Sequence, residues 1–483
     1  MAIISPGQRP SSDPTDSTRP GSTARRRAAH VLDPLVRLSA EVPATLHDPA
    51  PRALGALDQA GLWGNLGVSL LGFTGAMVVL QPGGTGTPTL PLVGAVLAVV
   101  VGTVLGSIAL GLSAVPGAET GSPAMVLLRG VFGTRVSYLP TVLNIVQMLG
   151  WGTFELVTIA TAARMVVPAV PQWGYVVIGG AVTTLLAIRP LGTARLLRRY
   201  VTVAVVLALA YLALQLLRRP LPAATVGSWS GFWPAADSAL AVAISWVPMA
   251  SDYARHSRSR GAALAGTAVG YGLTQIACYL VGILAIVTVA HDADHVFGAF
   301  LAVPAGTLVF AVLAVRELDQ SFANVYSTTV STQNLRPRWD RRVLAAVIGS
   351  AVTVLALVVH IGDYASFLSL IGSLFVPLFG VVFADWYLLR GRHRWDLSEH
   401  SPARPLLLLP WVLGFLAYQM IYPGGVSAWA RLWGRVDAAV GFVAQPWMSA
   451  SVVSFVVAVL VTLAVRRVSR AAAGPQASAG LRR

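Results

Sequence analysis

The sequence contains no lysine and only one cysteine in 483 residues, and charged residues make up only 11% of it. A single cysteine, Cys278, excludes a disulfide framework, and because it lies in an apolar stretch we expect it to be a packing residue. Soluble domains carry about 25% charged residues. Here 55% of the residues are hydrophobic and the mean hydropathy is +0.68, so the composition predicts a membrane protein.

Apolar runs close to the roughly 20 residues that cross a bilayer as a helix recur along the chain. We predict twelve spans, at residues 62–81, 90–113, 137–163, 173–188, 199–217, 236–252, 264–290, 299–328, 342–360, 363–389, 405–422 and 446–465. Short loops leave no room for a soluble domain. The sequence therefore predicts one all-α transmembrane domain over residues 51–465. We expect a disordered cytoplasmic tail before it, residues 1–50, and a second cytoplasmic tail after it, residues 466–483.

All 35 basic residues are arginines, and they are sorted by side of the membrane. The two tails and alternate loops hold 29 of them, the opposite side holds five, and Arg316 lies within a span. This asymmetry places both termini in the cytoplasm and the loop from His291 to His295 outside. It accounts for the net charge of +15 without a nucleic-acid partner, and it predicts a multi-pass protein of the cell membrane in contact with lipid.

Catalytic motifs are missing from the sequence. We find no HExxH, GxSxG, Walker-type loop or paired DDxxD motif. An intramembrane enzyme acting on lipid groups would need clustered aspartates at a helix end, whereas Asp252 and Asp385 are isolated. The His291–His295 loop, HDADH, has metal-ligand residue types, but we expect it to be a solvated loop because no third cluster supports it. We therefore predict a protein that is not an enzyme and has neither a cofactor nor a structural metal.

Two predicted spans contain interruptions that lie five spans apart. The first is Gly61-Leu62-Trp63-Gly64-Asn65-Leu66-Gly67, and the second is Ser245-Trp246-Val247-Pro248. Broken helices at matching places in two halves are typical of inverted-repeat transporters, whose unwound backbone binds substrate and ion. Glycine is also a common packing residue in membrane helices, so a packing role stays open.

Polar and aromatic side chains recur every three to four residues in the third span, at Asn144, Gln147, Trp151, Glu155 and Thr158. They therefore share one helical stripe. An ionised Glu155 at membrane depth would cost about 2.5–3.5 kcal/mol unless it faced an interior site. An indole one turn from a carboxyl group suits a flat heterocycle that stacks and donates hydrogen bonds. The alternative is a structural Trp151 beside a glutamate in an ion pair between helices.

The eighth span, VFAVLAVRELDQSFANVYS, contains three charges. One helical stripe and its neighbour carry Arg316, Glu317, Asp319, Gln320 and Asn324. Unpaired, the charges would cost on the order of 8–10 kcal/mol in the membrane. We expect an Arg316–Asp319 pair, which leaves Glu317 or Asp319 to take a proton or a cation. A wholly structural network is the alternative.

Four segments resemble the nucleobase/cation symporters, a family that includes purine and cytosine permeases. They are YLPTVLNIVQMLGWGTFELV, SDYARHSRSRGAALAGTAVGY, RELDQSFANVYS and PLFGVVFADWYLLRGR. The resemblance covers residues from about 50 to 465. In the second and fourth segments, Asp252 with Arg255 and Asp385 look like family signatures at cytoplasmic helix ends.

The resemblance implies a core of ten helices in an inverted five-plus-five repeat, as in sodium-coupled amino-acid transporters, with two further C-terminal helices. It implies a substrate at the membrane midplane, stacked on Trp151 and bound at its edge by Glu155, which replaces the family's amide, and by Asn324. The family's second stacking aromatic falls at Ala243, and Trp246 lies one turn further on. We expect Gln147, Gly64 and Asn65 to complete the substrate site.

The cation site implied by the resemblance departs from the family. Sodium-coupled members use hydroxyl side chains in the eighth span, where this chain has Leu318 and Asp319. We expect Asp319, with Glu317 and Gln320, to couple the cation. Two carboxylates without a hydroxyl pair favour a proton, and sodium near Asp319 is the alternative. The resemblance assigns no role to Arg316.

The carboxylate of Glu155 accepts hydrogen bonds, so it favours a substrate edge with donors, such as an exocyclic amine. Cytosine and hydroxymethylpyrimidine carry that edge, and a permease subgroup for the latter looks similar; purines come next. We therefore predict a monomeric secondary symporter that imports a small planar nitrogen heterocycle with H+ or Na+. An amino-acid or other solute carrier of the same fold is the rival.

Overall fold

The structure, a computed structural model, describes residues 42–82, 89–192, 201–293, 295–359 and 364–472. Of the predicted tails, residues 1–41 and 473–483 lie outside the described residues, as does residue 294 of the HDADH loop. The described parts are helical and contain no strand; one isolated backbone bridge joins Leu54 to Ser257.

The first helices are α2 (Ala56–Leu66), α3 (Leu70–Leu80), α4 (Leu92–Thr120), α5 (Ala124–Phe132), α6 (Thr134–Val166), α7 (Gln172–Ile188), α9 (Thr202–Leu217), α10 (Phe232–Ser245) and α11 (Ala250–Ala254). The later ones are α12 (Arg260–Ala285), α13 (Val296–Leu301), α14 (Gly306–Arg316), α15 (Leu318–Leu335), α16 (Arg341–Ala356), α17 (Tyr364–Phe383), α18 (Leu408–Ile421), α19 (Ser427–Val440) and α20 (Ala450–Ala472). Short turns of 3₁₀ or π helix are η2 (Trp229–Gly231), η3 (Val247–Met249), η4 (Ile286–Ala290), η6 (Ala384–Leu388), η7 (Gly391–His393) and η8 (Pro405–Leu407).

Each of the twelve predicted spans contains one helix or several consecutive helices, and residues 199, 200, 360 and 363 of these spans lie outside the described residues. Among the described residues, five helical stretches are long and apolar enough to cross a membrane, and the bent pair α2–α3 makes a sixth. The five lie in α4, α6, α12 with η4, α17 with η6, and α20. The protein is thus a multi-pass membrane protein, while the count of twelve spans stays a prediction.

The first predicted interruption separates α2 from α3, which meet at 65°. Gly67 ends α2, and a Cβ atom built on it would lie 2.2 Å from Thr274 Oγ1 and 2.6 Å from the carbonyl oxygen of Tyr271. Only glycine therefore lets the break lie this close to α12. Ser69 then starts α3, since its side chain accepts a hydrogen bond from the backbone N–H of Leu71.

The second predicted interruption separates α10 from α11. Helix α10 ends at Ser245, and Pro248 lies in the short turn η3 that follows. Proline has no backbone N–H and its ring crowds the preceding turn, so the α-helix cannot run through this position. The two broken helices are therefore both present where the sequence predicts them.

Small residues bring the helices of the bundle close together. Built Cβ atoms at Gly266 and Gly270 of α12 would lie 2.7 Å or less from backbone oxygens of α2. Built Cβ atoms at Gly102 and Gly106 of α4 would lie 2.0 and 2.9 Å from backbone oxygens of α10. Membrane helices associate through such close packing, because lipid offers no hydrophobic driving force between them.

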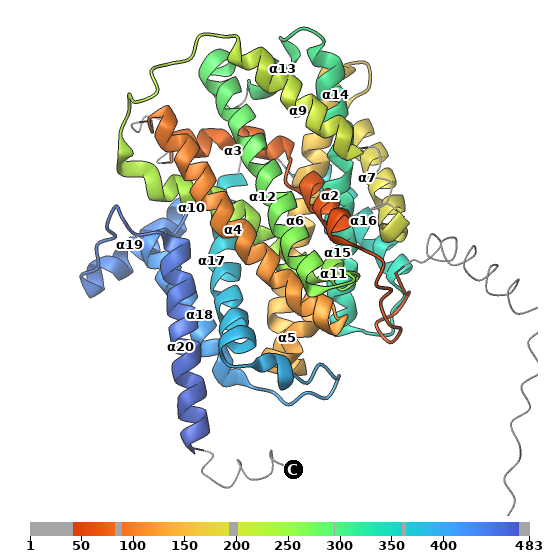
Figure 1. Cartoon of the computed structure of the whole chain (residues 1–483), viewed down its shortest axis with the longest axis vertical. Helices are drawn as coiled ribbons and strands as arrows, with labels where there is room; N and C mark the ends of the chain where they lie inside the picture. Colours follow the sequence, from red (N-terminus) through yellow and green to blue (C-terminus); the bar gives the residue numbers. More distant parts are fainter. Residues whose placement is uncertain (1–41, 83–88, 193–200, 294, 360–363, 473–483) are drawn as a thin grey trace, which may run out of the picture. The chain divides into compact units, whose positions relative to one another are not determined.

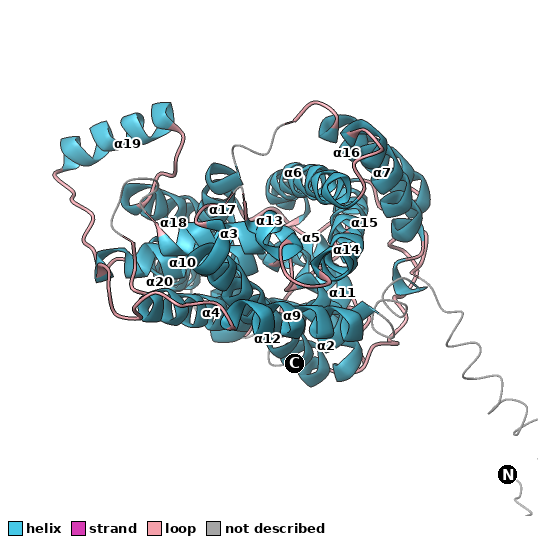
Figure 2. Ribbon diagram, turned by 90° about the horizontal axis from the view of Figure 1, so that it is seen from above, coloured by secondary structure: helices cyan, strands magenta, loops and turns pink. Residues whose placement is uncertain are grey.

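The last three helices, α18 to α20, gather at one edge of the bundle beside α17 and α10, and α7 and α16 lie at the opposite edge (Figures 1 and 2). Two aspartates, the half-buried Asp237 and the buried Asp385, fasten α20. At its start, Asp237 of α10 accepts hydrogen bonds from Ser449 Oγ (2.6 Å) and the backbone N–H of Ala450 (2.8 Å). Near its other end, Asp385 pairs with Arg466 at 2.7 Å and accepts a hydrogen bond from Trp395 Nε1 at 2.6 Å.

We predict that Asp385→Asn destabilises the protein on the order of 3 kcal/mol, because it removes one partner of a buried ion pair. Thermal unfolding of the detergent-solubilised protein measures this as a lower melting temperature. Asp396→Asn, at an exposed carboxylate in the following loop, is the matched control and should leave the melting temperature unchanged. Equal melting temperatures for both variants would show that the Asp385 pair does not contribute to stability.

Candidate functional site

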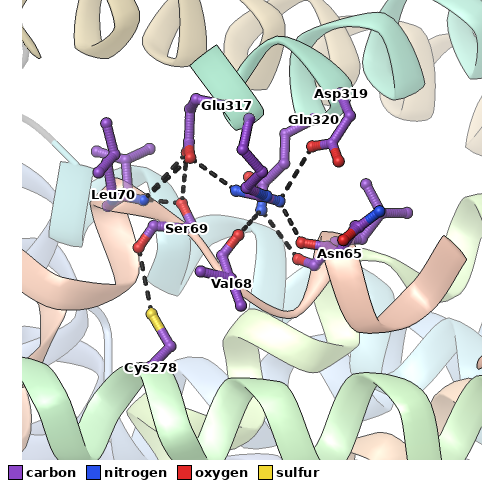
Figure 3. Close-up of polar contacts among 11 residues, drawn as sticks. Asn65, Val68, Ser69, Leu70, Cys278, Glu317, Asp319 and Gln320 are labelled. Carbon is purple, nitrogen blue, oxygen red and sulfur yellow. Dashed lines mark hydrogen bonds and ion pairs between the residues drawn. The ribbon is translucent and has the colours of Figure 1, made fainter. Parts of the chain in front are cut away.

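The junction between α14 and α15 faces the break between α2 and α3, and the polar groups of both meet there (Figure 3). Arg316 Nη1 lies 2.7 Å from Glu317 Oε2, and Arg316 Nη2 lies 3.1 Å from Asp319 Oδ1. All three side chains are at most 1% exposed. The expected Arg316–Asp319 pair is therefore present, but Glu317 is also paired, so neither carboxylate is left without the guanidinium.

Side chains of α14 and α15 also satisfy the carbonyl groups at the end of α2. Arg316 Nη2 donates to the carbonyl oxygen of Asn65, and Gln320 Nε2 donates to those of Leu66 (2.9 Å) and Val68 (2.7 Å). A helix end leaves its last carbonyls without partners inside the helix. The hydrogen bonds from Arg316 and Gln320 satisfy these carbonyl groups, and Figure 3 shows Gln320 beside Val68.

The start of α3 is held by Glu317. Its carboxylate accepts hydrogen bonds from Ser69 Oγ (2.9 Å) and from the backbone N–H of Leu70 (3.1 Å to Oε1). A negative charge is favourable at a helix N-terminus, where the backbone N–H groups are free. We call Arg316, Glu317, Asp319 and Gln320, together with the α2–α3 break that they contact, the junction network.

A narrow cavity of about 30 Å³ lies beside the junction network. Helices α2, α3, α6, α10, α12 and α15, or the breaks next to them, line it. Five predicted site residues border it: Trp151, Glu155, Trp246, Gln320 and Asn324. Residues from the third, sixth and eighth predicted spans thus meet around one space, as does the backbone break at Gly67 and Ser69.

Trp151 and Glu155 lie one turn apart on α6. The Trp151 ring packs edge-on against Phe367, with ring centroids 5.4 Å apart. The Glu155 carboxyl group faces Glu317 within hydrogen-bonding reach, although both are acceptors when ionised. Because α6 carries the two side chains on one stripe, ring and carboxyl border the same cavity.

Three side-chain polar atoms of residues that border the cavity have no hydrogen-bond partner among the residues that the structure describes. They are Glu155 Oε2 and Gln275 Oε1, both acceptors, and Asn324 Nδ2, a donor, and all three side chains are 2% exposed. Buried polar atoms are nearly always hydrogen-bonded, so an unpaired acceptor and donor at one cavity need an explanation. These atoms are thus open to a ligand with complementary groups.

Three predicted substrate residues do not border the cavity. Gln147 Nε2 donates to Asn144 Oδ1 at 2.8 Å. Gly64 faces α12, where a built Cβ atom would lie 3.6 Å from the carbonyl oxygen of Gly270. Asn65 belongs to the junction network through its carbonyl oxygen, while its side chain is buried. In span six, Trp246 borders the cavity and Ala243 does not.

Sequence reasoning missed the contribution of α12. Tyr271, Gln275 and Tyr279 border the cavity, as does Cys278. Gln275 Nε2 donates to the carbonyl oxygen of Ala239 at 2.7 Å and to Thr103 Oγ1 at 3.0 Å. These residues recur every three to four positions, so the criterion used for the third span would have found this stripe too.

The predicted signature residues hold helix ends together outside the cavity. Asp252 Oδ1 accepts a hydrogen bond from the backbone N–H of Ala124 at 2.8 Å, at the start of α5. Arg255 Nη2 donates to Tyr326 Oη at 3.2 Å. Together with the Asp385–Arg466 pair, these contacts indicate that the signature residues cap helix ends and fasten neighbouring helices to one another.

Within the described ranges, no group of three or more histidine, cysteine, aspartate or glutamate side chains is placed to hold a metal ion. In the HDADH loop, His295 Nδ1 lies 2.8 Å from Asp292 Oδ1, and the histidine side chain is 75% exposed. That pair is a local contact on a solvated loop.

Solved structures share this fold. Over 89% of this chain and 95% of the other, it is similar to Mhp1, a nucleobase-cation-symport-1 family transporter, in a closed conformation with bromovinylhydantoin bound (TM-score 0.68, 17% identity). The inward-facing conformation of Mhp1 matches with a TM-score of 0.59 at 18% identity, covering 90% and 94% of the two chains. A Na+-coupled sialic acid symporter matches with a TM-score of 0.60 at 12% identity, covering 91% and 95%. No curated protein sequence matches the chain.

A family model described as a permease for cytosine/purines, uracil, thiamine and allantoin matches residues 60–397, well over half of the 483 residues. The match confirms the resemblance carried by the four sequence segments. It also agrees with the missing catalytic motifs, since the family consists of transporters of small molecules and not of enzymes. The chain therefore belongs to the family of permeases for cytosine and purines, uracil, thiamine and allantoin.

Proposed function

We propose that this permease is a secondary symporter that imports a small planar nitrogen heterocycle, first an aminopyrimidine such as cytosine or hydroxymethylpyrimidine and next a purine. It works as a monomer in the cell membrane with both termini in the cytoplasm, and a proton or sodium gradient drives it. The single observation that carries the proposal is the unpaired acceptor of Glu155 and the unpaired donor of Asn324 at one cavity beside Trp151.

Two broken helices support an inverted five-plus-five repeat of ten helices with two further C-terminal helices, twelve spans in all. The α2–α3 break borders the cavity through Gly67 and Ser69, and the α10–α11 break borders it through Ser245 and Trp246. Related breaks that face one cavity are typical of inverted-repeat transporters, whose halves rock around a fixed site.

The substrate roles follow from the chemistry of the cavity walls. Trp151 offers an aromatic face to a flat ring, and Trp246 provides a second aromatic wall. An aminopyrimidine has an amine donor next to a ring-nitrogen acceptor. These match the free acceptor of Glu155 and the free donor of Asn324, so one molecule satisfies both. Three further residues, Gln147, Gly64 and Asn65, do not border the cavity and support the residues that do.

The cation is coupled at the junction network, through Asp319 and Glu317 with Gln320. The related transporters named above are a nucleobase-cation-symport-1 member and a Na+-coupled symporter, so a cation is the expected driving ion. Three carboxyl groups, Glu155, Glu317 and Asp319, surround one guanidinium here. Their excess negative charge favours a proton as the coupled ion.

Uptake into proteoliposomes tests this function directly. Labelled cytosine and hydroxymethylpyrimidine are supplied while a proton gradient and a sodium gradient are imposed separately. We expect accumulation of at least one compound above its outside concentration. Equilibration without accumulation would indicate a channel, and transport of amino acids in place of heterocycles would support the rival carrier.

We predict that Trp151→Ala weakens binding of the heterocycle about 5- to 150-fold, since stacking of a base on an aromatic side chain contributes about 1–3 kcal/mol. Trp151→Phe should retain most of the affinity because it keeps a ring. The affinity is measured by competition for uptake of the labelled substrate. Trp173→Ala, at a tryptophan that is 64% exposed, is the control. Unchanged uptake by Trp151→Ala would favour a carrier that needs no stacking platform.

We predict that Glu155→Gln lowers the preference for aminopyrimidines over uracil about tenfold, because an amide replaces one hydrogen-bond acceptor with a donor. The measurement is the ratio of uptake rates for cytosine and uracil in the variant and the unchanged protein. Glu119→Gln, at the far end of α4, removes a carboxylate that does not border the cavity and serves as the control. An unchanged ratio of cytosine to uracil uptake would show that Glu155 does not form hydrogen bonds that select the substrate.

A further inference from the structure

The end of α2 has the features of a cation site. The carbonyl oxygens of Asn65, Leu66 and Val68 lie where the helix is interrupted, at the negative end of its dipole. In transporters with discontinuous helices, such unwound carbonyls coordinate Na+. A sodium-coupled permease would therefore be expected to hold its ion at this break.

Side-chain nitrogens already occupy these oxygens. Arg316 Nη2 donates to Asn65, and Gln320 Nε2 donates to both Leu66 and Val68 (Figure 3). A guanidinium carries only donors and keeps its charge in proteins. An alkali ion at the same carbonyls would compete with these N–H groups, and it would lie against a fixed positive charge.

Both carboxylates of the junction network likewise form ion pairs with Arg316. Glu317 pairs with Arg316 at 2.7 Å while it holds the start of α3, and Asp319 pairs with it at 3.1 Å. The positive guanidinium thus faces the carbonyl end of α2, and the negative Glu317 faces the amide end of α3. Both ends of the broken helix are matched in charge by side chains of the chain itself.

We propose that Arg316 is a resident cation that takes the place of sodium at the α2–α3 break, so that transport needs no sodium ion. The inference rests on the proposed import of a heterocycle and leaves the proton as its coupling ion. The donor set of the break does not fit sodium, because a permanent cation and an amide fill it.

The first test compares sodium chloride with choline chloride at equal ionic strength. We expect the initial rate of heterocycle uptake under a proton gradient and the melting temperature of the purified protein to be the same in both salts. A higher uptake rate or a higher melting temperature in sodium would overturn the proposal. The melting experiment needs no substrate, so it stays decisive even if no heterocycle is transported and the proposed function fails.

The second test removes the resident cation. Arg316→Ala frees the carbonyl of Asn65 and the carboxylates of Glu317 and Asp319, and these oxygens suit sodium. We expect the melting temperature of this variant to rise with sodium concentration, as binding to the folded state requires. Arg341→Ala removes another fully buried arginine, which donates to Ala187 and Ile188 outside the network, and it should gain no sodium response.

If Arg316→Ala does not fold, Arg316→Gln is tested in its place, because it removes the charge and keeps one amide donor group at this position. A folded Arg316→Ala or Arg316→Gln protein that sodium does not stabilise would contradict the proposal. So would an equal sodium response in Arg341→Ala.

Discussion

The contact of the Arg316 guanidinium with the open end of α2 and with two carboxylates is the constraint around which this permease is built. Each of these charges would cost about 2.5–3.5 kcal/mol at membrane depth if it were alone. Together, they neutralise one another at 2.7 and 3.1 Å and satisfy a helix end that lipid cannot hydrate. The break in α2–α3 and the charges of α14–α15 therefore require each other.

The same network reaches the cavity. Gln320 holds the carbonyls of Leu66 and Val68 and also borders the cavity, and Glu155 borders the cavity while it faces Glu317. A ligand in the cavity would touch side chains that also hold the broken helix in its bent form. The wall of the cavity and the contacts that hold the broken helix thus share Gln320.

Hydropathy and spacing were enough to predict much of this structure. Every predicted span contains a helix, because a long apolar run has few other ways to satisfy its backbone in lipid. Helices α5 and α19 were missed, since they have only 9 and 14 residues and lie between spans. The breaks at Gly67 and Pro248 were also visible in the sequence, because glycine and proline act locally.

The candidate site was less accessible from the sequence. The Arg316–Asp319 pair follows from a spacing of three residues, so the sequence predicts it. The hydrogen bond from Ser69 to Glu317 joins residues that are 248 positions apart, and no local sequence pattern predicts it. Spacing within one helix also does not show that Asn324 and Trp151 border the same cavity. The family resemblance predicted that both belong to one site.

The fastening of α20 at both ends bears on how far this fold can be shortened. A shortened form that ends before α18 would lose helices α18 to α20. Truncation would remove Ser449 and Ala450 from Asp237, and Arg466 from Asp385, so that Asp385 would keep only its contacts outside α20, such as the one with Trp395. A shortened form would therefore lose partners of both aspartates together with the helices, which links the end of the chain to α10 and to the turn after α17.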